Sequence, residues 1–139
     1  MAFVLDASVA ACWALSDEDH PAAEVAFRRI RHTEAITPTL WWFEIRNILI
    51  VSERRKRITQ SESSDFLREI SQLPIRVDHD VDEADVMRLA RSHRLSIYDA
   101  AYLELARRNR APLATLDADL ARAAKAEAVT LIEDTRDQA

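Results

Sequence analysis

Glycine is absent from the 139 residues of this chain. Phosphate-binding loops and dinucleotide-binding turns depend on glycine, because their backbone approaches the phosphates closely and takes positive φ. The chain therefore contains neither a P-loop nor a dinucleotide fingerprint, and it lacks the glycine-flanked nucleophile turn of a serine hydrolase. Helix ends must also find another residue for the left-handed conformation, and we expect Asn109 to take that place.

Cysteine is nearly absent as well. Cys12 is the single cysteine, so no internal disulfide can form, and a reduced, cytoplasmic setting is expected rather than secretion. No apolar run reaches the roughly 18 residues that a membrane span needs. The start, Met1 to Asp6, has no basic segment and meets an aspartate at once, which argues against a signal peptide. We therefore expect a cytoplasmic protein without a membrane partner.

Positive charge is in short supply. The chain has 19 Lys and Arg against 24 Asp and Glu, a net charge of −5, whereas nucleic-acid binders are usually basic. The cations gather in three runs, Arg28–Arg31, Arg54–Arg57 and Arg107–Arg110. Each run lies where a predicted helix ends, and cations there suit the helix dipole. Contact with RNA and stabilisation of helix ends are both open interpretations.

Short apolar runs alternate with helical patterns along the chain. Strands are expected at 2–5, 35–37, 75–77, 113–116 and 129–132, and helices at 9–15, 21–31, 40–55, 59–72, 82–94, 97–108 and 120–126. Strands separated by helices imply a mainly parallel sheet that is covered on both faces. No linker divides the chain, so we expect a single domain over 1–139, with a frayed tail at 134–139.

Two of the expected strands run into an aspartate that opens a helix. Asp6 follows Val4-Leu5, and Asp117 follows Thr115-Leu116. Helix capping explains either aspartate alone. It does not explain why two strands deliver carboxylates to the same edge, where parallel sheets bind ligands. Thr115 and Asp119 would add further oxygen atoms there.

Two other acidic residues lie on helices. Glu44 falls on or beside an apolar stripe that runs through Trp41 and Ile45, too far into its helix to be a cap. A carboxylate in apolar surroundings is costly unless it is paired or binds a metal, although a glutamate at the edge of the stripe could also reach solvent. Asp99 stands three residues after Ser96, which is the spacing of a capping box. That local role explains Asp99 as well as a site does.

The remaining reactive side chains do not converge. The four histidines lack the spacing of metal ligands, and each is expected at the surface: His20, His32, His79 and His93. A phosphatase or phospho-acceptor domain also places aspartates at strand ends, but it needs a second acid near the first and a lysine near the phosphate. Asp6-Ala7-Ser8 lacks the second acid, and neither Lys56 nor Lys125 follows a strand.

Four motifs occur in a characteristic order. They are Val4-Leu5-Asp6-Ala7-Ser8, then Glu44 with Asn47 and Leu49, then the stretch from Leu95 to Ala106, and finally the stretch from Pro112 to Ala121. In this order and spacing the chain resembles PIN-domain proteins, and specifically the VapC-type toxins of bacterial type II toxin–antitoxin pairs. The resemblance covers nearly the whole chain. One departure is Ser92-His93-Arg94, where the family commonly has a glycine.

The resemblance implies a three-layer α/β/α fold with a five-stranded, mainly parallel sheet. It implies an acidic pocket formed by Asp6, Glu44, Asp99 and Asp117, supported by Ser8, Thr115 and Asp119, with Asn47 mattering more to structure. It also implies a metal-dependent endoribonuclease that uses Mg²⁺ or Mn²⁺, a homodimer, an RNA substrate and a VapB-type antitoxin.

Crowded carboxylates repel one another, and hard divalent cations with oxygen ligands relieve that repulsion. The hypothesis is one or two metal ions that activate a water and steady charge on the scissile phosphodiester. Asp6, Asp99 and Asp117 would be the first ligands, and Glu44 a further ligand or the group that orients the water. A non-catalytic binding module, in which the acids only cap helices, is the alternative.

Tryptophan offers one more expectation. Trp41 and Trp42 point about 100° apart on one helix, so both cannot be equally deep. Packing in the core is the default for each, and the alternative is that one of them forms an exposed patch for an antitoxin or a second subunit.

Overall fold

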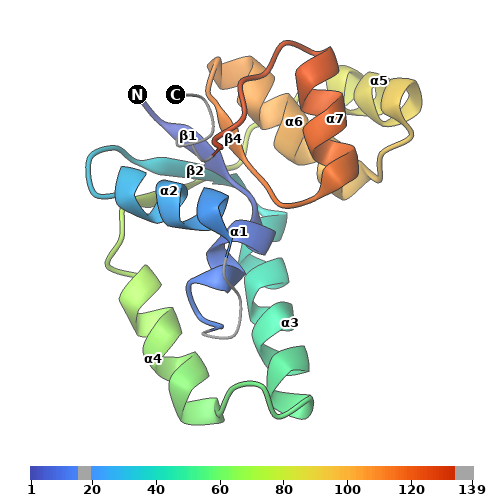
Figure 1. Cartoon of the computed structure of the whole chain (residues 1–139). Coiled ribbons are helices and arrows are strands. Elements are labelled where there is room, and N and C mark those ends of the chain that lie inside the picture. The colour runs from blue at the N-terminus through green and yellow to red at the C-terminus, as the bar shows by residue number, and fades with distance from the viewer. Residues whose placement is uncertain (16–19, 134–139) are drawn as a thin grey trace.

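The computed structural model describes residues 1–15 and 20–133, so the tail predicted for 134–139 lies outside the described residues. Strands and helices alternate over this range (Figure 1). The elements are β1 (Phe3–Leu5), α1 (Ala7–Cys12), α2 (Pro21–Arg29), β2 (Ala35–Pro38), α3 (Leu40–Arg54), α4 (Gln60–Ile70), β3 (Ile75–Asp78), α5 (Glu83–His93), α6 (Ile97–Asn109), β4 (Leu113–Ala114) and α7 (Ala118–Ala126).

The strands form one parallel sheet in the order β3-β2-β1-β4. β1 lies inside the sheet, and its three residues Phe3, Val4 and Leu5 are fully buried. A strand covered on both faces needs a continuous apolar run rather than an alternating one, and Phe-Val-Leu supplies it. Because all four strands run the same way, their carboxyl ends share one edge of the sheet.

The predicted fifth strand at 129–132 is wrong. It is reduced to a single bridge between Leu131 and Leu113, in which Leu113 donates to the carbonyl of Thr130 and accepts from the amide of Ile132. β4 ends at Ala114, one residue after Leu113, so the neighbouring segment has no further strand to pair with. The sheet therefore has four strands.

Helices cover both faces, which confirms the three-layer α/β/α arrangement. α6 packs on β1, β2 and β4, with α5 and α7 beside it. α2 contacts β4 from the other layer and packs against α1, which in turn contacts α3. In Figure 1, α3 and α4 extend away from the sheet as a pair of arms, on the side opposite α5. No helix among residues 1–15 and 20–133 is long and apolar enough to cross a membrane.

Basic residues end two helices where glycine would be usual. Arg94 and Arg110 are the left-handed C-caps of α5 and α6, with φ of 54° and 51°. Asn109 was the wrong choice for this role, because α6 runs one residue further. Asn109 is instead the last helical residue, and its side chain donates to the carbonyl of Leu105 at 2.9 Å. Each left-handed residue with a Cβ costs about 1–2 kcal/mol.

Candidate active site

Asp6 lies where β1 ends and α1 begins. Its carboxylate accepts hydrogen bonds from the Thr115 hydroxyl at 2.6 Å, the Ser8 hydroxyl at 3.0 Å and the Ser8 amide at 3.4 Å. The residue is only 7% exposed. Burial raises the pKa of Asp6, the hydrogen bonds oppose that rise, and the negative charge of Asp117 adds to it. Asp6 therefore caps α1 and is also a buried carboxylate close to another acid.

The segment after β4 is tied to the same place. The Thr115 hydroxyl accepts from the amide of Asp117 at 3.1 Å, and the Ser8 hydroxyl accepts from the amide of Leu116 at 3.2 Å. Ser8 and Thr115 thus join the carboxyl ends of β1 and β4 through Asp6. Asp117 is exposed and caps α7 by accepting from the amide of Leu120 at 2.8 Å.

Asp99 approaches from the first turn of α6. Its amide donates to the Ser96 hydroxyl at 3.1 Å, which is the cap that the sequence predicts. Its carboxylate is half-buried, and burial together with the negative charges of Asp117 and Asp6 raises its pKa. Asp119, which is exposed and paired with Arg122, adds to the same effect. The backbone of Asp99 is explained by the cap, but the position of its carboxylate among other acids is not.

Glu44 reaches the cluster from α3. The hydroxyl of Tyr102, a fully buried residue of α6, donates to Glu44 Oε1 at 2.6 Å. Burial raises the pKa of Glu44, the Tyr102 bond opposes it, and the negative charges of Asp6 and Asp99 add to the rise. Glu44 is therefore held inside the acidic cluster rather than turned to solvent at the edge of its stripe.

Tyr102 is a site residue that the sequence argument missed. It lies three residues after Asp99, so the two side chains share a face of α6. A fully buried tyrosine hydroxyl usually finds a polar partner. Together these signals could have pointed to Tyr102, but which carboxylate it meets depends on how α3 packs against α6.

The four acids form a donor set of hard oxygen atoms. As the side chains lie, no three Asp, Glu, His or Cys side chains in 1–15 and 20–133 converge closely enough to hold a metal ion. Mg²⁺ usually takes only one or two carboxylates and keeps several waters. The negative charges of neighbouring acids raise the pKa values of Asp6, Glu44 and Asp99, so a divalent cation at this place would relieve the repulsion. The chemistry of these carboxylate oxygens therefore fits a divalent cation.

Comparison with known proteins places this geometry in a family. The family model of the PIN domain matches residues 3–126, which spans every strand and helix described above. The chain belongs to the PIN-domain family. Among curated relatives of this PIN domain is Ribonuclease VapC3 from Pyrobaculum aerophilum, with 34% identity over 125 residues, which covers 87% of this chain and 93% of the relative.

Solved structures agree on the fold. PAE2754 from Pyrobaculum aerophilum matches with a TM-score of 0.74 at 23% identity, over 98% of this chain and 91% of the other. FitAcB from Neisseria gonorrhoeae matches with a TM-score of 0.65 at 14% identity, over 96% and 98% of the two chains. VapC20 from Mycobacterium tuberculosis, described as a toxin that cleaves the sarcin-ricin loop, matches at 0.59 and 15%, over 87% and 94%.

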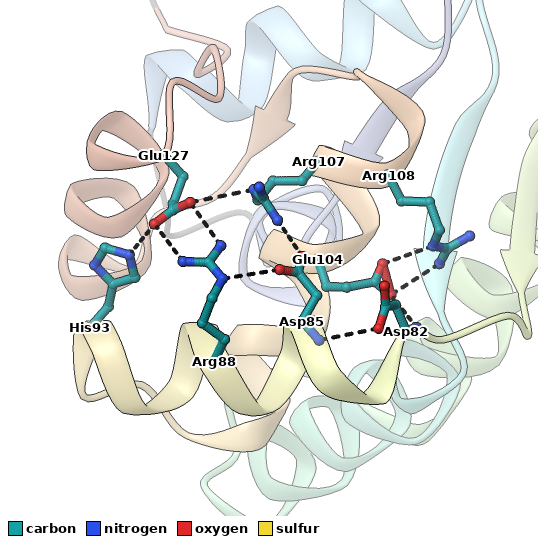
Figure 2. A network of polar contacts seen from close by, with 8 residues as sticks. All are labelled: Asp82, Asp85, Arg88, His93, Glu104, Arg107, Arg108 and Glu127. Carbon is teal, nitrogen blue, oxygen red and sulfur yellow. Dashed lines mark hydrogen bonds and ion pairs between the residues drawn. The ribbon is translucent and has the colours of Figure 1, made fainter.

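A polar network locks the helices that carry two of the acids of this PIN domain (Figure 2). Glu127, the C-cap of α7, accepts from Arg88 at 3.0 Å and lies 2.6 Å from His93 Nε2, both on α5. It is also 3.4 Å from Arg107 of α6, which pairs with Asp85. His93 was expected at the surface, but its side chain is 18% exposed because of this contact. The network fixes α6 and α7 relative to each other at the ends opposite Asp99 and Asp117.

A second part of the network holds the loop before α5. Glu104 of α6 is 1% exposed, and it accepts from Arg108 at 2.8 Å and from the amide of Asp82 at 3.2 Å. Arg108 also reaches both carboxylate oxygens of Asp78. Glu104 and Arg108 therefore form a buried ion pair with a structural role. None of their partners belongs to the acidic cluster.

Proposed function

We propose that this PIN domain is a metal-dependent endoribonuclease and the toxin of a VapBC-type toxin–antitoxin pair. The observation that carries the proposal is that the charges of four carboxylates act on one another at one edge of the sheet. They are Asp6 after β1, Glu44 on α3, Asp99 on α6 and Asp117 at the start of α7. The similarity of this chain to a relative named Ribonuclease VapC3 supports a ribonuclease reaction, and RNA is the substrate that we propose for this chain.

Each side chain has a role in the proposal. Asp6, Asp99 and Asp117 bind Mg²⁺ or Mn²⁺, and Glu44 is a further ligand or orients the attacking water. Ser8 and Thr115 hold Asp6 in place through their hydroxyls, and Asp119 adds negative charge.

The metal ion, when bound, supplies charge neutralisation for the phosphodiester and a more acidic water. Tyr102 holds one of the two oxygens of Glu44 by a hydrogen bond, and in this proposal the other oxygen serves the metal ion or the attacking water. In-line attack by water would leave a 5′-phosphate and a 3′-hydroxyl.

Two protein partners belong to the proposal. A toxin–antitoxin complex from Klebsiella pneumoniae shares the fold, with a TM-score of 0.57 over 83% of this chain, and a VapB-type antitoxin is the partner that we propose here. A homodimer is proposed from the exposed apolar residues at the starts of α3 and α6, which are Trp42, Phe43, Ile97 and Tyr98. Of the two tryptophans, Trp41 packs in the core, whereas Trp42 is 47% exposed and is available for a partner. We place the protein in the cytoplasm, where its RNA substrate would be.

The test measures cleavage of a labelled RNA with Mg²⁺, with Mn²⁺ and with chelator, by the full chain and by Asp99→Asn. We expect chelation to abolish cleavage and Asp99→Asn to reduce it about 100-fold or more, because the amide cannot replace a metal-binding charge. Asp65→Asn, on an exposed part of α4, is the matched control and should cleave like the parent. Full activity in a correctly folded Asp99→Asn protein would overturn the proposal.

The non-catalytic alternative makes a different prediction for Mg²⁺. If the acids only cap helices, Mg²⁺ should leave the melting temperature unchanged and no RNA should be cut. Sedimentation of the parent and of Phe43→Asp tests the homodimer, since a charge among these exposed apolar residues should shift the protein towards monomer. An unchanged dimer would move the interface away from these residues.

A further inference from the structure

A cavity of about 510 Å³ lies at the edge of the sheet opposite the acidic cluster. Its lining includes Met1, which precedes β1, and Pro112, which precedes β4. Asp6 and Thr115 stand at the other ends of the same two strands. The cavity therefore opens at the amino ends of the strands and shares no lining residue with the four acids.

Arginine dominates the charge of this cavity. Arg29 from the last turn of α2, and Arg107 and Arg110 from the end of α6, line it together with one acid, Glu127. Glu127 and Asp85 already engage Arg107. Within residues 1–15 and 20–133, neither Arg29 nor Arg110 has a hydrogen bond or ion pair from its side chain. A chain with a net charge of −5 thus lines one cavity with two arginines whose side chains have no acidic partner among the described residues.

The helix dipole partly explains why arginines lie at the ends of α2 and α6. Cations at the ends of α2 and α6 suit the partial negative charge there, and each arginine could be explained in that way alone. The dipole does not require the two helix ends to line one cavity, nor does it supply either arginine with an anionic partner. An anion between the two arginines would satisfy both.

We propose that this arginine cavity, defined by Arg29, Arg107 and Arg110, binds a phosphate group. The planar guanidinium fork matches two phosphate oxygens, and two forks from different helices can hold one group from two sides. The volume is within the range of small-molecule sites, so a nucleotide or one phosphate of an RNA chain has room. The inference stands on these residues and does not depend on the ribonuclease proposal.

The first experiment compares thermal unfolding of the full chain in sodium phosphate, in 5′-AMP and in sodium chloride at equal ionic strength. Chelator is present throughout, so that metal at the acidic edge does not contribute. Phosphate at about ten times its dissociation constant should raise Tm by about 5 °C over chloride. The double variant Arg29→Gln/Arg110→Gln should lose this shift. Arg54→Gln/Arg91→Gln removes two exposed charges outside the cavity, and it should keep the shift.

A second experiment identifies where the phosphate comes from. Binding of a labelled single-stranded RNA is measured by anisotropy over a range of salt concentrations, again with chelator. If the arginines hold an RNA phosphate, the double variant should bind more weakly, with a salt slope reduced by about 1. If RNA binding is unchanged while the phosphate shift is lost, the ligand is a free phosphate or nucleotide. A parent protein that responds equally to phosphate and chloride, or a folded double variant that keeps the shift, overturns the proposal.

Discussion

Hydroxyl groups set the geometry of the acidic cluster at the scale of single residues. Thr115 and Ser8 each touch Asp6, and Tyr102 touches Glu44. All three donors lower the energy of the charged carboxylate, which burial and neighbouring acids raise. Three neutral hydroxyl groups therefore stabilise the charged forms of Asp6 and Glu44 and hold their carboxylates in position.

Tyr102→Phe tests this stabilisation. The ring stays in the core, but Glu44 loses its donor, so we expect RNA cleavage to fall about 10-fold or more and the free energy of unfolding to fall by about 1–3 kcal/mol. Tyr98→Phe removes a hydroxyl from an exposed tyrosine four residues earlier and is the matched control. Cleavage rates and urea unfolding measure the two effects. Equal cleavage by Tyr102→Phe and the parent would remove Tyr102 from the site.

Three of the four acids could be predicted from the pattern of apolar residues in the sequence. The apolar stripe marked Glu44 as out of place, and the strand ends marked Asp6 and Asp117, and the structure brings all three to one edge. Asp99 was explained locally by its cap, so only the family resemblance assigned it. Tyr102 escaped, because a tyrosine in an apolar helix is expected in the core whether or not its hydroxyl has a partner.

At the scale of elements, Glu127 is the residue on which α5, α6 and α7 meet. Arg88, His93 and Arg107 surround it, and its side chain is 16% exposed. These partners, Arg88 first, lower the pKa of Glu127 to about 2 from the ordinary 4.5. No sequence pattern indicates this arrangement, since the partners of Glu127 are 20 to 39 residues away and meet only after three helices pack.

Glu127→Gln should therefore destabilise the domain in a pH-dependent way. A depressed pKa contributes stability above the unfolded value of 4.5, and that contribution is lost as the pH falls through about 2. The difference in free energy of unfolding between parent and variant should be at most about 3 kcal/mol near neutral pH. Urea unfolding at a series of pH values should show the gap narrowing below about pH 4. Glu133→Gln, which alters a more exposed pair with Lys125, is the control, and a gap that stays constant with pH would contradict the assignment.

Element boundaries show where sequence patterns stop being informative. The capping box of Thr59 and Glu62 at the start of α4 can be read from their spacing in the sequence, because its chemistry is local. The strand predicted at 129–132 was wrong, because pairing at Leu131 depends on how far β4 extends. The left-handed position at Arg110 rather than Asn109 likewise depends on where α6 ends against the sheet.

At the scale of the whole molecule, the acidic edge opposes folding when it carries its full charge. Burial and mutual repulsion raise the pKa values of Asp6, Glu44 and Asp99. A raised acid pKa stabilises the folded state below the unfolded pKa, and that contribution is lost as the pH rises through the folded pKa. Without a cation, the charged cluster then costs stability at neutral pH.

Mg²⁺ should consequently stabilise the domain more at high pH than at low pH. We expect a saturating concentration to raise Tm by about 5–10 °C near pH 8 and by less near pH 5, where the acids hold protons. Thermal unfolding in MgCl₂ against NaCl of equal ionic strength measures this, and Asp99→Asn should show a smaller gain. A gain that does not vary with pH would mean that Mg²⁺ acts somewhere other than at these carboxylates.

The short central strand has a practical consequence for handling the protein. Only β1 separates Met1 from Asp6, yet Met1 lines the arginine cavity while Asp6 belongs to the acidic edge. A purification tag placed before Met1 would emerge beside Arg29 and Arg110 and leave the carboxylates clear. Cleavage assays should tolerate such a fusion, whereas phosphate titrations need the chain without a tag, because an acidic extension would compete with phosphate for the arginines.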